Sequence, residues 1–271
     1  MNIFLGGVIQ QLFSAMRKLT IMVHLLITNV KIPANAQFFF AGLLSFVTFD
    51  LIELGPYIRK ALNLYDDELS IRNLSDLGYS SNYFAINIGS LLLVMVYLIC
   101  LLIFYACTWM IRNKKFIHYR SKIVSGLFWN KIFSFINESY LQLTVSCIVN
   151  FVHFDLRSYG TFISTNAAMF AFAVCLLFPI FSLCFLKNNR SKLRTWRFKD
   201  KYESLYEGLA YKRGHYIVLA EPFFSFMRVL ILISALILLQ KNSYFQIFVA
   251  NFTITFMVIY AGMASPYQDK T

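Results

Sequence analysis

Long apolar runs without a charge constrain this chain more than any other feature of its sequence. The ranges Ile86–Ile111, Asn166–Leu186 and Tyr244–Ala264 contain no charged side chain, and Phe223–Leu239 contains only Arg228. About 20 apolar residues cross the hydrocarbon core of a bilayer as an α-helix. The sequence therefore predicts an all-α fold, a polytopic transmembrane helical bundle that includes at least these spans.

Two weaker stretches bring the expected total to about six spans. The first, residues 127–152, carries four charged or amide side chains: Lys131, Asn137, Glu138 and Gln142. Such groups normally face other helices or a wet cavity inside a membrane protein, so we expect this helix to face the bundle. The second, residues 37–54, is short and ends in acidic residues at the outer interface. Residues 3–30 form either a seventh span or an amphipathic helix along the inner surface.

The distribution of Lys and Arg predicts which loops are cytoplasmic. Both residue types are concentrated in segments 112–122 and 187–222, and basic loops normally stay on the cytoplasmic side. The range 55–85 is close to neutral and contains an N-glycosylation sequon that begins at Asn73. We therefore expect this range to face outwards, with Asn73 as the candidate glycosylation site.

Charge, cysteine usage and missing motifs argue against several classes of protein. The formal net charge is +12, but the basic residues flank apolar spans, where lipid headgroups attract them, so we expect no nucleic-acid partner. All five cysteines lie in apolar segments, which favours small buried hydrophobes over a disulfide framework. The four histidines have no metal-ligand spacing, and no P-loop, HExxH, GxSxG or CxxC motif occurs. We expect neither an enzyme, a bound metal nor a cofactor. The inverted repeats of a small-molecule transporter are not visible either.

Three polar features are candidate functional sites, and two of them lie within spans. In the weak span, Asn137 precedes Glu138, and Glu138 shares a helical face with Gln142 because the two are four residues apart. These side chains form either a cation or gating site inside the bundle or an interhelical hydrogen-bond contact. Arg228 is either a charge coupled to voltage or ligand, or a side chain that snorkels to the headgroups or pairs with Glu221.

The third feature is the segment 198–209 in the cytoplasmic linker. Its apolar and aromatic positions recur at helical spacing: Tyr202, Leu205, Tyr206 and Leu209. The pattern predicts an amphipathic helix. This helix either lies at the inner membrane surface or is a solvated linker that delivers the chain to the next span.

The same linker resembles a segment of ciliate multi-pass membrane proteins that are similar to TRP-like and polycystin-like channels. The stretch KYESLYEGL is followed by an Arg-bearing apolar helix and then by YFQIFVANF. The linker motif that carries the resemblance includes Lys201, Tyr202, Leu205, Tyr206, Glu207 and Gly208. Further segments resemble the same group in order along the chain: LLITNVKIPANAQFFF, FVTFDLIEL, LGYSSNYFAINIGSLLL and FWNKIFSFINESYLQL.

The resemblance implies a channel-type membrane protein, or a subunit or fragment of one, in the plasma or ciliary membrane. An organelle membrane is the alternative location. In that family further helices follow the helical part, so we expect part of the pore-lining pair to lie beyond Thr271. The alternative function is a non-conducting structural or accessory subunit that packs its Phe-rich faces against partners. On both readings the partners are membrane lipids and other membrane subunits, in a homo- or hetero-oligomer.

Overall fold

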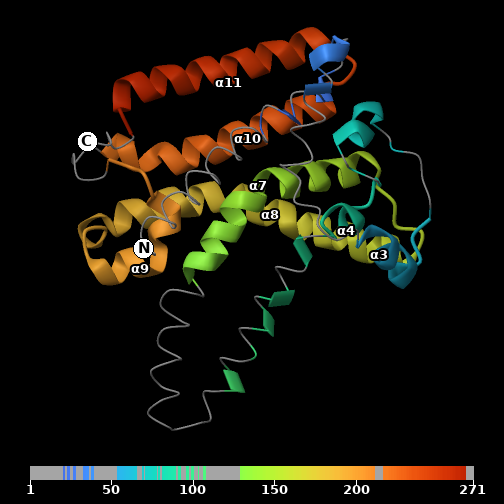
Figure 1. Cartoon of the computed structure of the whole chain (residues 1–271), viewed down its shortest axis with the longest axis horizontal. Helices are drawn as coiled ribbons and strands as arrows, with labels where there is room; N and C mark the ends of the chain where they lie inside the picture. The colour runs from blue at the N-terminus through green and yellow to red at the C-terminus, as the bar shows by residue number, and fades with distance from the viewer. Residues whose placement is uncertain are drawn as a thin grey trace. The chain divides into compact units, whose positions relative to one another are not determined.

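In the computed structural model, all regular elements of the described part are helices. The structure describes these residues: 21, 23–24, 27–28, 33–36, 38–39, 54–65, 69, 71–77, 79, 81–89, 91–92, 96–97, 99–100, 103, 106–107, 129–210 and 216–266. Four of the helices are long enough and apolar enough to cross a membrane, and Figure 1 shows them as the longest elements: α7 (Trp129–Val152), α8 (Tyr159–Asn188), α10 (Glu221–Leu238) and α11 (Ser243–Ala264). The protein is therefore a membrane-embedded helical protein.

These helices coincide with four of the predicted spans. Of the other expected spans, residues 37–54 fall mostly outside the described residues, as does the segment 3–30, whereas half of the range 86–111 is described. The beginning of the range 86–111 is described, because the short helix α4 covers Phe84–Asn87. The number of spans beyond four stays a prediction.

Two compact units divide the chain, and each long helix contributes a part to both. Unit 1 takes its described residues from Met1–Ser90, Leu141–Val174 and Val229–Thr253. Unit 2 takes them from Leu91–Tyr140, Cys175–Arg228 and Ile254–Thr271.

Helix α8 begins at a capping arrangement and continues through a proline. The Ser158 hydroxyl accepts from the Thr161 N–H at 3.1 Å, and the Thr161 hydroxyl accepts from the Ser158 N–H at 3.0 Å. This reciprocal pairing satisfies two N–H groups that a helix N-terminus leaves open. Within the helix, Pro179 lacks an N–H, so the carbonyl of Cys175 loses its usual partner. In unit 2 the Tyr140 hydroxyl donates to that carbonyl at 2.8 Å.

Helices α10 and α11 form an antiparallel hairpin with a short turn between them (Figure 1). In unit 1, Gln246 is fully buried, and its Nε2 donates to the carbonyl of Leu236 at 2.8 Å. This carbonyl is among the last four of α10, which have no partner within the helix. In unit 2, the Tyr260 hydroxyl donates to the carbonyl of Ile217 at 2.7 Å.

The C-terminal end of helix α3 packs onto the first turn of α8 in unit 1. Helix α3 (Gly55–Leu62) ends at Asn63, whose φ of 49° is left-handed, as is common at helix C-termini. A Cβ added to Gly160 would meet the carbonyl of Leu62. Only glycine fits there, because α3 approaches α8 at its backbone.

Candidate intramembrane polar site

One face of α7 in unit 1 is polar although it lies in an apolar helix. Gln142, Ser146 and Asn150 follow one another at intervals of four residues, so they share one side of the helix. Ser146 and Asn150 are fully buried, and Gln142 is half-buried. An uncharged polar face of this kind in a span must meet hydrogen-bonding groups from other elements.

The segment that leads into α4 supplies those groups. Gln142 Nε2 donates to the main-chain carbonyl of Asn87 at 3.1 Å, and Asn150 Nδ2 lies 3.5 Å from the carbonyl of Asn82. The side chain of Asn87 turns back within its own segment, where Nδ2 donates to the carbonyl of Ser81 at 2.7 Å. The polar side chains of α7 therefore bind main-chain carbonyls.

Helix α8 completes the arrangement through Ser164. The Ser164 hydroxyl is fully buried, accepts from the N–H of Ala85 at 3.2 Å, and lies 3.5 Å from Asn150 Nδ2. We call the group formed by Asn82, Asn87, Gln142, Ser146, Asn150 and Ser164 the polar centre. It joins α7, α8 and the α4 segment within unit 1. The polar centre contains no charged side chain.

Three side-chain oxygens of the polar centre are buried and have no hydrogen-bond partner among the described residues. They are Asn87 Oδ1, Ser146 Oγ and Asn150 Oδ1. Their side chains are at most 9% exposed. Groups of three or more His, Cys, Asp or Glu side chains that could hold a metal ion do not occur in the part of the chain that the structure covers.

The two residues of the predicted pair, Glu138 and Gln142, lie in different environments. Gln142 belongs to the polar centre of unit 1, whereas Glu138 belongs to unit 2, is exposed, and accepts from the Ser134 hydroxyl at 2.7 Å. Asn137 is half-buried. The sequence pattern singled out Gln142 but not its hydrogen-bond partner Asn87, which lies 55 residues away.

Arg228 lies in α10 within unit 2. Its side chain is half-buried, and Nε is buried without a hydrogen-bond partner in the described part of the protein. The Glu221 carboxylate accepts from the Ser225 hydroxyl at 2.7 Å. Three roles of Arg228 therefore stay predictions: a charge coupled to voltage or ligand, a side chain that snorkels to the headgroups, and a partner of Glu221.

The linker segment forms helix α9 over Trp196–Tyr206, so the helix ends earlier than the predicted residue 209. Glu207 is extended, and Gly208 has a φ of +78°, a conformation that glycine adopts without strain and that ends the helix. Leu209 is nevertheless buried. Lys201 is half-buried.

The predicted apolar face of α9 packs against α7 and α8 in unit 2. Its rings belong to an aromatic cluster of seven side chains: Phe133, Phe178, Phe181, Phe185, Phe198, Tyr202 and Tyr206. The ring centroids of Tyr202 lie 4.7 Å from Phe198 and 5.0 Å from Phe185. Leu205 is also buried, and it directly precedes Tyr206 of the cluster in the sequence.

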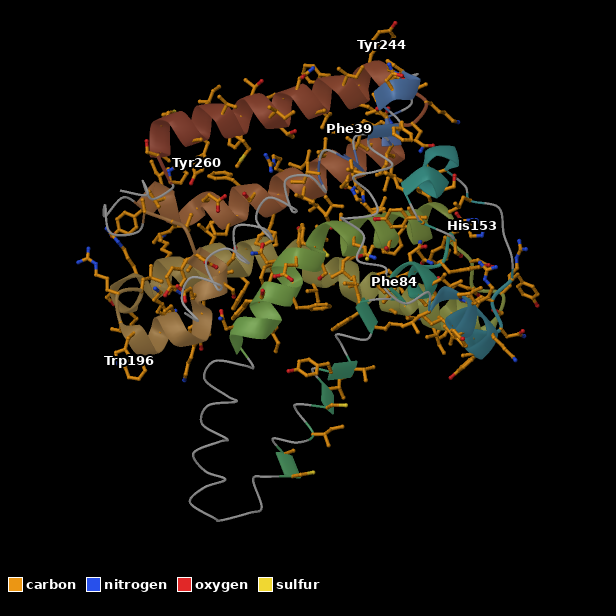
Figure 2. All side chains as sticks on the ribbon, in the orientation of Figure 1. Phe39, Phe84, His153, Trp196, Tyr244 and Tyr260 are labelled. Carbon is orange, nitrogen blue, oxygen red and sulfur yellow. The ribbon has the colours of Figure 1, made fainter. Side chains whose placement is uncertain are left out.

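Two hydrogen bonds fix α9 to the first turn of α7. The N–H of Ser204 donates to Asn130 Oδ1 at 2.9 Å, and the Ser204 hydroxyl donates to the Asn130 carbonyl at 3.0 Å. Trp196 is 73% exposed and points outward at the start of α9 (Figure 2). Whether α9 lies at the inner membrane surface or is a solvated linker stays a prediction.

The remaining sequence candidates are outside the polar centre. Asn73 lies in the 3-10 helix η2 (Arg72–Leu77), and its side chain lies outside the described residues. None of the five cysteines, all of which are described, forms a disulfide bond. Cys147 and Cys175 are buried as expected, but Cys100, Cys107 and Cys184 are exposed on apolar helical segments. Exposed positions on such helices are compatible with cysteines that behave as small hydrophobes, because the surfaces of membrane helices are themselves apolar.

No protein-family model, curated protein or solved structure matches this chain.

Proposed function

We propose that this protein is a TRP- or polycystin-like membrane protein of the cation-channel type, or a subunit or fragment of one. The observation that carries the proposal is the position of Glu138. Its carboxylate is exposed on α7, a helix that otherwise qualifies as a membrane span. Among the described residues it has one polar partner, the Ser134 hydroxyl of the same helix.

The depth of Glu138 along the helix makes this exposure informative. The apolar window of α7 begins at Ile132, and at 1.5 Å per residue Glu138 lies about 9 Å further along the helix. An acid facing lipid near the middle of a span costs about 2.5 to 3.5 kcal/mol. Intramembrane acids therefore face water or protein. An exposed acid at this depth fits a hydrated path or an interface between subunits.

A carboxylate on a hydrated path would attract cations and repel anions. Acidic side chains that surround a path select cations in this way. The 2.7 Å hydrogen bond from Ser134 holds one oxygen of Glu138, and the second oxygen remains for an ion or a partner. The resemblance of the linker sequence to channel-type proteins points in the same direction.

A non-conducting accessory subunit is the second candidate, and α11 favours it. Only 11% of the apolar window of α11 is buried within this chain. Its exposed side chains include several large aromatic and aliphatic residues: Tyr244, Phe245, Phe248, Phe252, Phe256 and Ile259. Tyr244, at 90% exposed, points away from the helix (Figure 2). Such a face can pack against other membrane subunits.

Substitution of Glu138 by Gln tests the channel proposal. The protein is expressed in cells, its amount at the surface is matched between variants, and whole-cell currents are recorded in solutions of different cation content. We expect Glu138→Gln to reduce the cation current and to shift the reversal potential towards that of anions. Glu203→Gln is the control, since Glu203 pairs with Lys199 in α9 at 3.0 Å and lies outside the long helices.

Two results would remove the channel proposal. The first is a current whose size and reversal potential are the same in Glu138→Gln and in the natural sequence. The second is no current above background, with the purified protein bound stably to another membrane protein. The second result would favour the accessory subunit, and native mass spectrometry of the complex would identify its stoichiometry.

A further inference from the structure

The linker that follows α8 begins with a run of positive charge. From Lys187 to Lys199 the sequence has six Lys and Arg side chains and neither Asp nor Glu. Three exposed members of this run lie in the last turn of α8 and in the turn that follows it: Lys187, Lys192 and Arg194. We call these three side chains the linker cations. Because like charges repel one another, a surface that displays them together favours an anionic partner.

The turn between α8 and α9 has a defined backbone. It contains the 3-10 helix η4 (Arg190–Lys192), and the Thr195 hydroxyl donates to the carbonyl of Lys192 at 2.7 Å. The hydroxyl of Tyr206 in α9 donates to the carbonyl of Leu193 at 3.4 Å. The backbone that carries two of the linker cations is therefore tied to α9.

Contacts within unit 2 place α9 level with the ends of two candidate spans. Ser204 of α9 forms its two hydrogen bonds with Asn130, two residues before the apolar window of α7 begins at Ile132. On α8, Phe185 stacks on Phe198 of α9 with 5.7 Å between the ring centroids, and Phe185 lies three residues before the end of that span. Since a span crosses the hydrocarbon core, its ends lie next to the headgroup layer.

The apolar face of α9 is covered by protein, so its exposed side is the one that can meet a partner. Phe198 and Tyr206 are buried in the aromatic cluster, together with the half-buried Tyr202. These side chains are therefore not available to insert into lipid. On the exposed side, Trp196 is 73% exposed and points outward (Figure 2). An indole ring has an apolar body and one N–H, which suits the layer between water and hydrocarbon.

We propose that the linker cations and Trp196 form a surface that binds the anionic headgroups of phospholipids, for which phosphatidylserine is the probe. The cations attract the phosphate and carboxylate groups, and the indole ring lies among the headgroups beside them. An acidic protein segment is a weaker match, because lipid surrounds a protein at the ends of its spans. The proposal holds with either candidate function, since it involves neither Glu138 nor α11.

Quenching of Trp196 in lipid nanodiscs tests the proposal. The full chain is reconstituted in phosphatidylcholine with a small fraction of nitroxide-labelled phosphatidylserine or nitroxide-labelled phosphatidylcholine, and the nitroxide is close to the headgroup. The chain has three tryptophans, so the same measurement on Trp196→Phe is subtracted to isolate the signal of Trp196. The ratio of quenching by the two labelled lipids gives the preference of this surface for phosphatidylserine.

The expected preference follows from the charge of the surface. Each Lys or Arg near an anionic membrane surface strengthens the attraction about five-fold. We therefore expect phosphatidylserine to be preferred by about five-fold or more at Trp196. The preference should fall as the NaCl concentration rises, because salt screens exposed charges.

Removal of charge at two matched sets of positions gives the specific result. The triple variant Lys187→Gln, Lys192→Gln, Arg194→Gln should reduce the preference to about one, and Lys187→Gln alone should lower it by up to about five-fold. The matched control replaces three exposed cations of unit 1 by Gln and removes the same charge from the chain. These are Lys60, Arg157 and Lys241. The control should keep the full preference.

Three results would overturn the proposal. Trp196 that neither labelled lipid quenches would place this surface in water, as in a solvated linker or in one that binds an acidic protein segment. Equal quenching by the two lipids would mean that the surface meets the membrane without selecting anionic headgroups. The same preference in both triple variants would show that the selection does not arise at the linker cations.

Discussion

The hydroxyl of Tyr140 donates a 2.8 Å hydrogen bond to the main-chain carbonyl of Cys175, four residues before Pro179. In an uninterrupted helix the N–H of residue 179 would donate to this carbonyl, but proline has no N–H. Helix α7 thus provides the hydrogen bond that α8 lacks within unit 2. The same bond satisfies the hydroxyl of a tyrosine that is 2% exposed.

A double-mutant cycle tests this compensation. We expect Tyr140→Phe to lower the free energy of unfolding by about 1 to 3 kcal/mol, because it leaves a buried carbonyl unpaired. In Pro179→Ala the N–H of the new residue pairs with Cys175, so Tyr140→Phe should cost at least about 0.5 kcal/mol less there. Denaturation in mixed micelles measures the four variants. The same cost of Tyr140→Phe in both backgrounds would contradict the compensation.

Hydropathy was sufficient to predict the four long helices. A backbone in lipid must satisfy its own hydrogen bonds, so an apolar run of sufficient length has to be helical. The polar centre was harder to predict. Sequence spacing placed Gln142 with Glu138, but the hydrogen bond of Gln142 goes to Asn87, 55 residues away. Pairings at such a distance depend on how helices pack, and one sequence does not specify that packing.

Small polar residues were missed for a related reason. Ser146 and Ser164 are individually unremarkable, since serine is common where membrane helices pack closely. Asn150 was a stronger indication, because a second amide eight residues after Gln142 extends the same helical face. The sequence also contained a signal for the end of α9. Gly208 is typical of a position just past a helix C-terminus, and the helix ends two residues before it.

Phe133 should hold α9 against the rest of unit 2. Its ring is 5% exposed and lies within 6.4 Å, centroid to centroid, of Phe178, Phe181, Phe185 and Tyr202. Phe133→Ala creates a cavity in this aromatic cluster and should destabilise it by roughly 3 to 5 kcal/mol. We expect faster hydrogen exchange in peptides that cover α9, measured by mass spectrometry.

Phe170→Ala is the control for this substitution. Phe170 lies in α8 and is 74% exposed, so its loss should change stability by no more than about 0.5 kcal/mol. Exchange in α9 that is equally fast in both variants would show that the aromatic cluster does not anchor the linker helix.

A glycan at Asn73 would establish which side of the membrane carries the loop before α4. Leu74 is fully buried and Ser75 is exposed in η2. If residues 55–85 face outwards, expression in eukaryotic cells should give a species that migrates faster after treatment with an endoglycosidase. Asn73→Gln and Ser75→Ala should each remove the slower species, because both residues belong to the sequon. A glycan that persists in Asn73→Gln would lie elsewhere and would not report on this loop.

Two glycines should respond in opposite directions to the same substitution. In Gly160→Ala the new methyl group meets the carbonyl of Leu62, the last residue of α3. The backbone must shift, so we expect a loss of about 1 to 3 kcal/mol in stability. In Gly262→Ala nothing lies within 4 Å of the added Cβ, and alanine should stabilise α11 by up to about 1 kcal/mol. Thermal unfolding of both variants in one detergent measures the difference. Equal Tm values would mean that α3 does not approach the first turn of α8 closely.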